Sequence, residues 1–108
     1  MNKFKKLVEL AKDSIEKYIV QYFENSLVVL LPTKTEDLIL GLGSEWFVNI
    51  LTMAGYSHKT IERKIDNMDF DKLVIALDDW YKTEMYPKLY NKFQSEGKEI
   101  LDYSKKNY

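Results

Sequence analysis

Apolar residues recur at alternating spacings of four and three along the first 22 residues of the chain. The stripe consists of Phe4, Val8, Ala11, Ile15, Tyr18 and Tyr22, with Leu7 and Ile19 beside it. Charged residues such as Lys5, Lys12 and Lys17 occupy other positions. This period predicts an amphipathic helix whose apolar side packs on the protein's own core. The same regular stripe also suits a partner helix or a second copy of the chain.

The pattern from residue 26 to residue 43 is ambiguous. Residues 27–31 form a short apolar run that ends at Pro32, which is typical of either a short strand or the buried end of a helix. Thr33, Thr35, Glu36 and Asp37 follow, and capping side chains with acids in the next turn are a helix start signal. We expect a short helix here, with a β-hairpin over residues 26–43 as the alternative.

Two helices separated by a glycine are predicted over residues 44–67. Ser44 is placed to cap the first helix, and Gly55 ends it because glycine adopts the left-handed conformation without steric cost. Its apolar side consists of Trp46, Phe47, Ile50, Leu51 and Ala54. Ser57 is placed to cap the second helix, which would bury Ile61, Ile65 and Met68. Its outward side would consist of His58, Lys59, Glu62, Arg63 and Asp66.

The helical period continues towards the end of the chain. Asp69 is placed to cap a helix whose stripe comprises Phe70, Leu73, Val74, Leu77, Trp80 and Tyr81. Pro87 either kinks this helix or starts a new one in its first turn. The stripe continues through Leu89, Tyr90 and Phe93 and resumes past Gly97 at Ile100, Leu101 and Tyr103. The pattern predicts a mainly all-α protein of about five helices, with residues 1–108 in a single helical domain.

Composition and charge narrow the classes of function. The chain has 108 residues, 45% of them hydrophobic, which suits one globular core. It has no cysteine, which excludes disulfides and thiolate metal sites, and its net charge of −1 gives no whole-molecule attraction to nucleic acid or anionic membranes. The longest apolar run, residues 27–31, is far shorter than the ~20 residues that span a bilayer. We expect a soluble, cytoplasmic protein with no membrane partner.

The most specific motif of the sequence lies in the predicted helix pair of residues 44–67. Ala54 and Gly55 form a small-residue turn, Ser57 can cap the next helix, and Thr60 and Ile61 follow. Residues 46–65 resemble the helix-turn-helix of bacterial and phage regulators in these positions, and differ from it at Leu51, where that family has a small residue. The resemblance implies a non-enzymatic protein, plausibly of plasmid or phage origin, that binds double-stranded DNA as a homodimer, because dimers contact paired half-sites.

The same resemblance assigns roles to the residues of the second helix. Ser57 would cap it, and the base-contacting positions would be His58, Lys59 and Glu62. The positions near the phosphates would be Thr60, Arg63 and Lys64. Within seven residues the sequence supplies the cations that phosphates attract and the polar groups that base edges bond. Glu62 and Asp66 reduce the local positive charge.

Aromatic residues support an alternative function. They make up 14% of the chain, and four of them gather around Pro87: Trp80, Tyr81, Tyr86 and Tyr90. Tyrosine and tryptophan are favoured at protein interfaces because they bury large areas while keeping a polar tip bonded. The alternative is therefore a small helical protein-binding module, such as a bacteriocin immunity protein or a phage-encoded inhibitor of a host protein. A helical aromatic stripe is, however, more often part of a core.

No pattern favours an enzyme, a metal or another cofactor. His58 is the only histidine, so a zinc site with two imidazoles is excluded. Asp78 and Asp79 are adjacent and diverge by ~100° around a helix, so their carboxylates do not converge on one ion. Gly41 and Gly43 lack the further glycine and lysine of phosphate-binding loops. We expect a protein that acts by binding alone.

Overall fold

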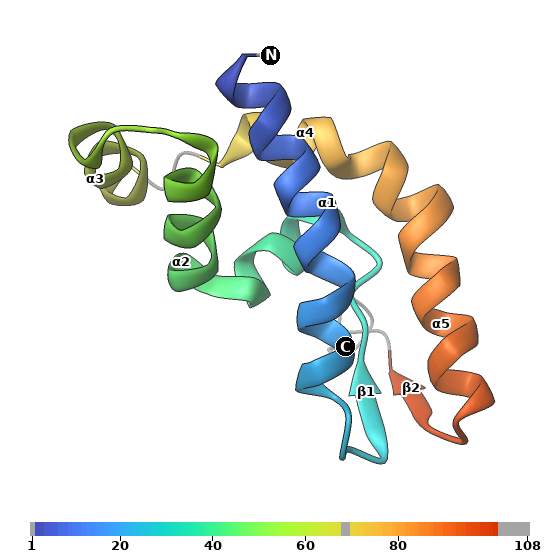
Figure 1. Cartoon of the computed structure of the whole chain (residues 1–108). Helices are drawn as coiled ribbons and strands as arrows, with labels where there is room; N and C mark the ends of the chain where they lie inside the picture. Colours follow the sequence, from blue (N-terminus) through green and yellow to red (C-terminus); the bar gives the residue numbers. More distant parts are fainter. Residues whose placement is uncertain (1, 68–69, 102–108) are drawn as a thin grey trace.

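The computed structural model describes residues 2–67 and 70–101, and it is mainly helical, as the hydrophobic pattern predicts. Figure 1 shows the helices α1 (Lys3–Tyr22), α2 (Thr35–Ala54), α3 (His58–Asp66), α4 (Asp71–Trp80) and α5 (Tyr86–Ser95), and the strands β1 (Val28–Leu30) and β2 (Glu99–Leu101). A π-helical turn, Tyr81–Met85, joins α4 to α5. Met68, Asp69 and Tyr103, for which the pattern predicts helical roles, lie outside the described residues.

Helix α1 begins at a capped terminus and packs along α2. The side chain of Asn2 accepts a hydrogen bond from the backbone amide of Lys5 (2.8 Å), as an N-cap residue does. Buried positions then recur every four residues, at Leu7, Ala11, Ile15 and Ile19. The indole Nε1 of Trp46 on α2 donates a hydrogen bond to Ser14 Oγ on α1 (2.9 Å). This bond satisfies a buried indole and fixes the two helices to each other.

The buried side of α1 differs from the predicted stripe at its carboxyl-terminal end. The stripe includes Tyr18 and Tyr22, but these side chains are 44% and 72% exposed. Residues four apart advance about 40° beyond a full helical turn, so a buried line at four-residue spacing rotates steadily around the helix. By the last two turns that line has moved to Ile15 and Ile19, and both tyrosines fall to one side of it.

Residues 26–43 do not form the alternative hairpin. Strand β1 pairs in parallel with β2 in the register Val28↔Glu99, Val29↔Ile100 and Leu30↔Leu101. The pairing corrects the prediction that Ile100 and Leu101 resume a helix. Parallel strands need a long connection, and the helices from α2 to α5 supply it.

Helix α2 starts at a buried threonine and bends at a glycine. The hydroxyl of Thr35 donates a hydrogen bond to Asp78 Oδ1 on α4 (2.7 Å), which satisfies a polar group that is only 1% exposed. Gly43 leaves the helical conformation (φ 88°, ψ 171°) and divides α2 into two parts. The second part buries the predicted set, Trp46, Phe47, Ile50, Leu51 and Ala54. The expected short helix after Pro32 and the expected helix from Ser44 are thus both present, joined at the bend.

The buried residues of α4, the π-helical turn and α5 follow one another at intervals of four. They are Leu73, Leu77, Tyr81, Met85, Leu89 and Phe93. Five such steps would rotate the buried line by about 200° in an uninterrupted α-helix. The wider π-helical turn, in which the Tyr86 amide donates to the Tyr81 carbonyl, reverses part of that rotation. Pro87 follows directly in the first turn of α5, where its missing amide is tolerated.

The buried apolar side chains of these elements form one hydrophobic cluster that includes residues of every helix and of β1. Figure 1 shows α1 in the middle of the molecule, with α2 and α3 on one side and α4 and α5 on the other. Within residues 2–67 and 70–101, no helix combines the length and the apolar character that crossing a membrane requires.

Candidate nucleic-acid interface

The turn between α2 and α3 is built around Gly55. Its backbone is left-handed (φ 96°), and two hydrogen bonds close the turn: Gly55 N to Thr52 O and Tyr56 N to Leu51 O, both 3.1 Å. This is the Schellman pair of bonds, which satisfies carbonyls that the end of a helix leaves open. Leu51, bulky where helix-turn-helix regulators have a small residue, is fully buried in the core below the turn.

Helix α3 is capped as the sequence predicts. Ser57 Oγ accepts a hydrogen bond from the backbone amide of Thr60 (3.2 Å) and donates one to Thr60 Oγ1 (2.9 Å). The cap fixes the start of a helix that is only nine residues long and would be marginal in isolation. Ile61 is the buried anchor of α3, and Ile65 packs beside it half-buried.

The outer side of α3 faces solvent. Its exposed residues are Ser57, His58, Lys59, Glu62, Arg63 and Asp66, whereas Thr60 and Lys64 are half-buried. His58 Nε2 lies 2.9 Å from Glu62 Oε1, and their side chains are 89% and 62% exposed, so the contact is a surface pair of little energetic weight. Among the described residues, no carboxylate pairs with Lys59 or Arg63. These two cations lie four residues apart and therefore on one side of the helix.

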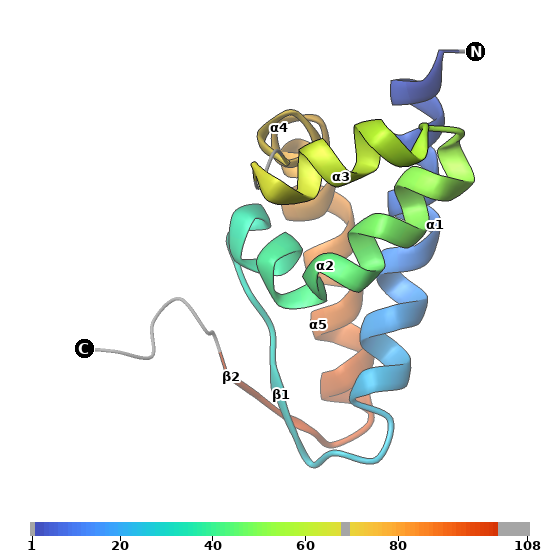
Figure 2. The same cartoon turned by 90° about the vertical axis from the view of Figure 1, so that its left-hand side faces the viewer.

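Figure 2 shows how α3 sits on the molecule. After the turn, α3 runs back alongside the second part of α2, and no other helix or strand is drawn in front of it. Helix α3 is therefore a surface helix whose exposed residues are accessible to a partner.

Further lysines approach α3 from two other helices. Tyr56, between Gly55 and Ser57, has Lys3 Nζ of α1 at 5.8 Å and Lys64 Nζ of α3 at 5.7 Å from its ring centroid. Lys64 and Lys72 of α4 also line one hollow of about 350 Å³ beside Tyr56. Burial raises the pKa of the Tyr56 hydroxyl, which keeps the ring neutral beside the lysines. Cations of α1, α3 and α4 thus meet at the edge of α3.

The local charge is positive although the chain as a whole is not. On α3 the three cations Lys59, Arg63 and Lys64 exceed Glu62 and Asp66 by one. The neighbouring lysines of α1 and α4 add to this excess, so the region can be positive although the net charge of the whole chain is not. A region of this kind attracts phosphates over short distances only, because salt screens charges beyond about 8 Å in physiological conditions.

The predicted aromatic interface is largely inside the molecule. Tyr81 is fully buried and its hydroxyl donates a hydrogen bond to the Pro32 carbonyl. Trp80 and Tyr86 are half-buried, and only Tyr90, 36% exposed, reaches the surface substantially. Tyr81 lies four residues after Leu77 and so continues the buried line of α4, and the π-helical turn that begins there keeps Met85, Leu89 and Phe93 close to the same line. The four residues therefore do not form one exposed patch.

Comparisons with models of protein families, with characterised proteins and with solved structures give no significant match.

Within the described residues, no group of three or more His, Asp or Glu side chains is arranged to hold a metal ion. The exposed cations of α3 could be identified from the sequence, whereas their neighbours Lys3, Tyr56 and Lys72 could not. Lys3 lies more than 50 residues before α3, and only the fold brings it to Tyr56. One indication in the sequence that Tyr56 belongs to this site is that it directly follows the turn glycine.

Proposed function

We propose that the protein binds double-stranded DNA through the outer side of α3. The observation that carries the proposal is the pair Lys59 and Arg63, which are exposed on one side of a capped surface helix and unpaired with any carboxylate of the described residues. A surface helix of this kind fits the major groove, whose width of about 12 Å admits an α-helix. The resemblance to helix-turn-helix regulators supports the same surface.

The roles of the individual residues follow from their positions. Lys59 and Arg63, one turn apart, are spaced to reach a phosphate and a base edge or two neighbouring phosphates. His58 and Glu62 are both exposed on the outer side of α3, and the Glu62 carboxylate can accept a hydrogen bond from a cytosine amino group in place of its contact with His58. Ser57 and Thr60 are engaged in the cap, so a phosphate at the start of α3 would meet the backbone amides of His58 and Lys59 instead.

The lysines around Tyr56 extend the contact beyond α3. Lys3, Lys64 and Lys72 come from three helices and surround the turn, where the backbone of DNA would pass beside a helix in the groove. With Lys59 and Arg63 they supply up to five phosphate contacts. Counterion release then predicts that the logarithm of the binding constant falls with the logarithm of salt concentration with a slope of about −4 to −5.

The proposal is tested by fluorescence anisotropy with a labelled mixed-sequence duplex at a series of salt concentrations. The double variant Lys59→Ala, Arg63→Ala is expected to bind at least about tenfold more weakly and to reduce the salt slope by about 2. The matched control is Lys82→Ala, Lys88→Ala, which removes the same charge from the π-helical turn and α5, where both lysines form exposed ion pairs. Equal losses in the two double variants, or no binding by the wild type at low salt, would contradict the proposal.

A further inference from the structure

Six of the nine large apolar side chains exposed within residues 2–67 and 70–101 belong to one groove or to the strands next to it. Tyr18, Tyr22 and Leu40 line the groove, whereas Leu27, Val28 and Leu101 lie on or beside β1 and β2, and β1 contributes Leu30 to the groove lining. We call these six residues, Tyr18, Tyr22, Leu27, Val28, Leu40 and Leu101, the apolar face. Leu27 is 81% exposed and Tyr22 is 72% exposed. The other three exposed residues of this type, Met53, Ile75 and Tyr90, lie on α2, α4 and α5 outside the groove. Monomeric proteins seldom leave a continuous apolar area of this kind uncovered.

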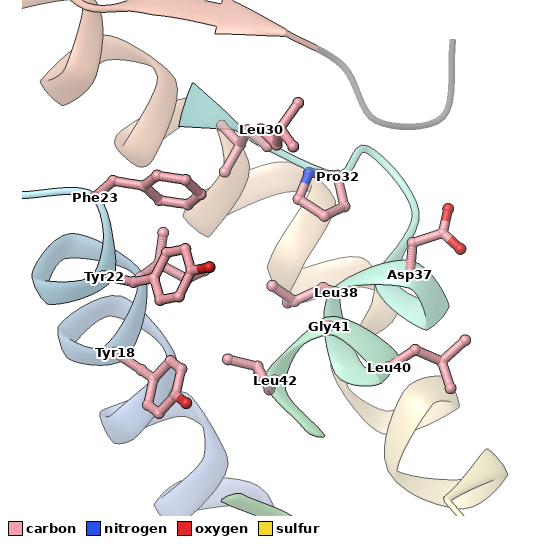
Figure 3. Close-up of a pocket in the computed structure, with 12 residues that line it drawn as sticks. Tyr18, Tyr22, Phe23, Leu30, Pro32, Asp37, Leu38, Leu40, Gly41 and Leu42 are labelled. Atoms are coloured by element: carbon pink, nitrogen blue, oxygen red, sulfur yellow. The ribbon is translucent and has the colours of Figure 1, made fainter. Parts of the chain in front are cut away.

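The groove lies between the end of α1, strand β1 and the first part of α2. Its volume is about 460 Å³, and Figure 3 shows Tyr18, Tyr22 and Phe23 on one side facing Leu38 and Leu42 on the other. Among the described residues, Asp37 is the only charged one in the lining, and Figure 3 shows its carboxylate directed away from the groove. Apolar groups can therefore enter without burying a charge.

Strand β1 has apolar residues on both of its faces, which is typical of a strand that is covered on both sides. Val29 is fully buried against the core, and Val28 and Leu30 lie on the opposite face, with Leu101 next to Leu30 in the register. A strand that packs on one face only normally carries polar residues on the other. Here the outward face is apolar as well, and it adjoins the groove.

One edge of β1 is also unpaired within the described residues. Leu31 N donates to Leu101 O, and Glu99 N donates to Leu27 O, so the odd-numbered residues of this segment face β2. The amide and carbonyl groups of Val28 and Leu30 therefore point away from β2. An apolar, β-branched edge without charges is the kind of strand that pairs with another copy of itself.

We propose that the apolar face is the surface through which two copies of this chain associate. The shape of the apolar face is self-complementary. It combines a hollow with two side chains that project at its margin, Tyr22 and Leu27, and a twofold axis would place these side chains in the hollow of the other copy. Its six residues are between 37% and 81% exposed, so each of them has surface that a second copy would cover. The exposed Glu99 is paired with Val28 and lies on the same side of the sheet, so a like surface would meet through the apolar residues with Glu99 at the margin of the contact.

This inference does not depend on DNA binding, because the apolar face and the outer side of α3 share no residue. Substitutions on α3 should leave association unchanged. Substitutions on the apolar face should leave the local charge around Tyr56 unchanged. The two proposals therefore fail or succeed separately.

The experiment is sedimentation equilibrium of the full chain from low micromolar to about millimolar concentration. The wild type is expected to shift from the 12.8 kDa monomer to twice that mass, with a Kd of about 10 μM or tighter. Tyr22→Glu and Leu27→Glu should each weaken association at least about 100-fold, because each places a charge in the apolar contact. Ile75→Glu, on α4 and 76% exposed, is the matched control and should associate as the wild type does. Circular dichroism checks that each variant retains its helical content.

Amide hydrogen exchange provides the second measurement. The amides of Val28 and Leu30 should exchange more slowly at concentrations above the Kd than below it, and Leu27→Glu should abolish this difference. A wild type that stays monomeric at about millimolar concentration would overturn the inference and leave the face for a different protein. A dimer that Tyr22→Glu and Leu27→Glu do not weaken, or that Ile75→Glu weakens equally, would overturn it as well.

Discussion

Two glycines of α2 should respond to the same substitution with opposite signs. Gly55 has a φ of 96°, in which an alanine is strained by about 1–2 kcal/mol, so Gly55→Ala should destabilise the protein by that amount. Gly41 is exposed within the helical part of α2, and a Cβ there meets no atom within 4 Å. Gly41→Ala should therefore stabilise the protein by about 0.5–1 kcal/mol through higher helix propensity.

The assay is urea unfolding followed by circular dichroism, with thermal melts in parallel. The variants should differ from each other by roughly 1.5–3 kcal/mol, and each kcal/mol corresponds to about 4–8 °C in Tm for a domain near 100 residues. Gly55→Asn should lose less than Gly55→Ala, since asparagine tolerates the left-handed region better. A neutral Gly55→Ala would refute the assigned turn and with it the placement of α3, and a destabilising Gly41→Ala would refute the exposed helical position assigned to Gly41.

Three further predictions concern single contacts. The Thr35 hydroxyl, followed by Lys82, lowers the pKa of Asp78 below 3.8. The ionised carboxylate therefore stabilises the fold at neutral pH, and that stabilisation is lost as the pH falls through the lowered pKa. Thr35→Val should make the free energy of unfolding fall less between neutral and acidic pH. Tyr81→Phe should cost about 1–2 kcal/mol in urea unfolding by leaving the carbonyl it contacts unbonded, with no loss of DNA binding. Lys3→Ala should lower the salt slope of DNA binding by about 1 without altering the Tm.

The local parts of the fold could be predicted from the sequence. Helix α1, the glycine turn and the Ser57 cap each depend on residues within one or two turns, and their periodicity and capping chemistry identify them. Strand pairing could not be predicted, because β1 and β2 are separated by about 70 residues and no local signal links them. The same non-local contact explains why residues 26–43 were open to two interpretations.

The burial or exposure of individual aromatic residues could not be predicted from the sequence either. Tyr81 fits both the apolar stripe of α4 and the cluster of aromatic residues around Pro87, and only the fold shows that it is buried at the i+4 position after Leu77. Tyr18 and Tyr22 show the reverse, since the rotation of the buried line along α1 exposes them. For the candidate site, the exposed cations of α3 followed from the period, whereas Lys3 and Lys72 required the tertiary fold.

The most direct test of DNA contact through α3 is a nuclear magnetic resonance titration of the isotope-labelled protein with an unlabelled duplex at low salt. The account predicts that the amides that shift are those of residues 57–64 and of Lys3, with Lys59 and Arg63 among the largest changes. The amides of α5 should remain in place. A titration in which residues 57–64 do not shift, or in which the changes gather on α5 or on the apolar face instead, would contradict the account.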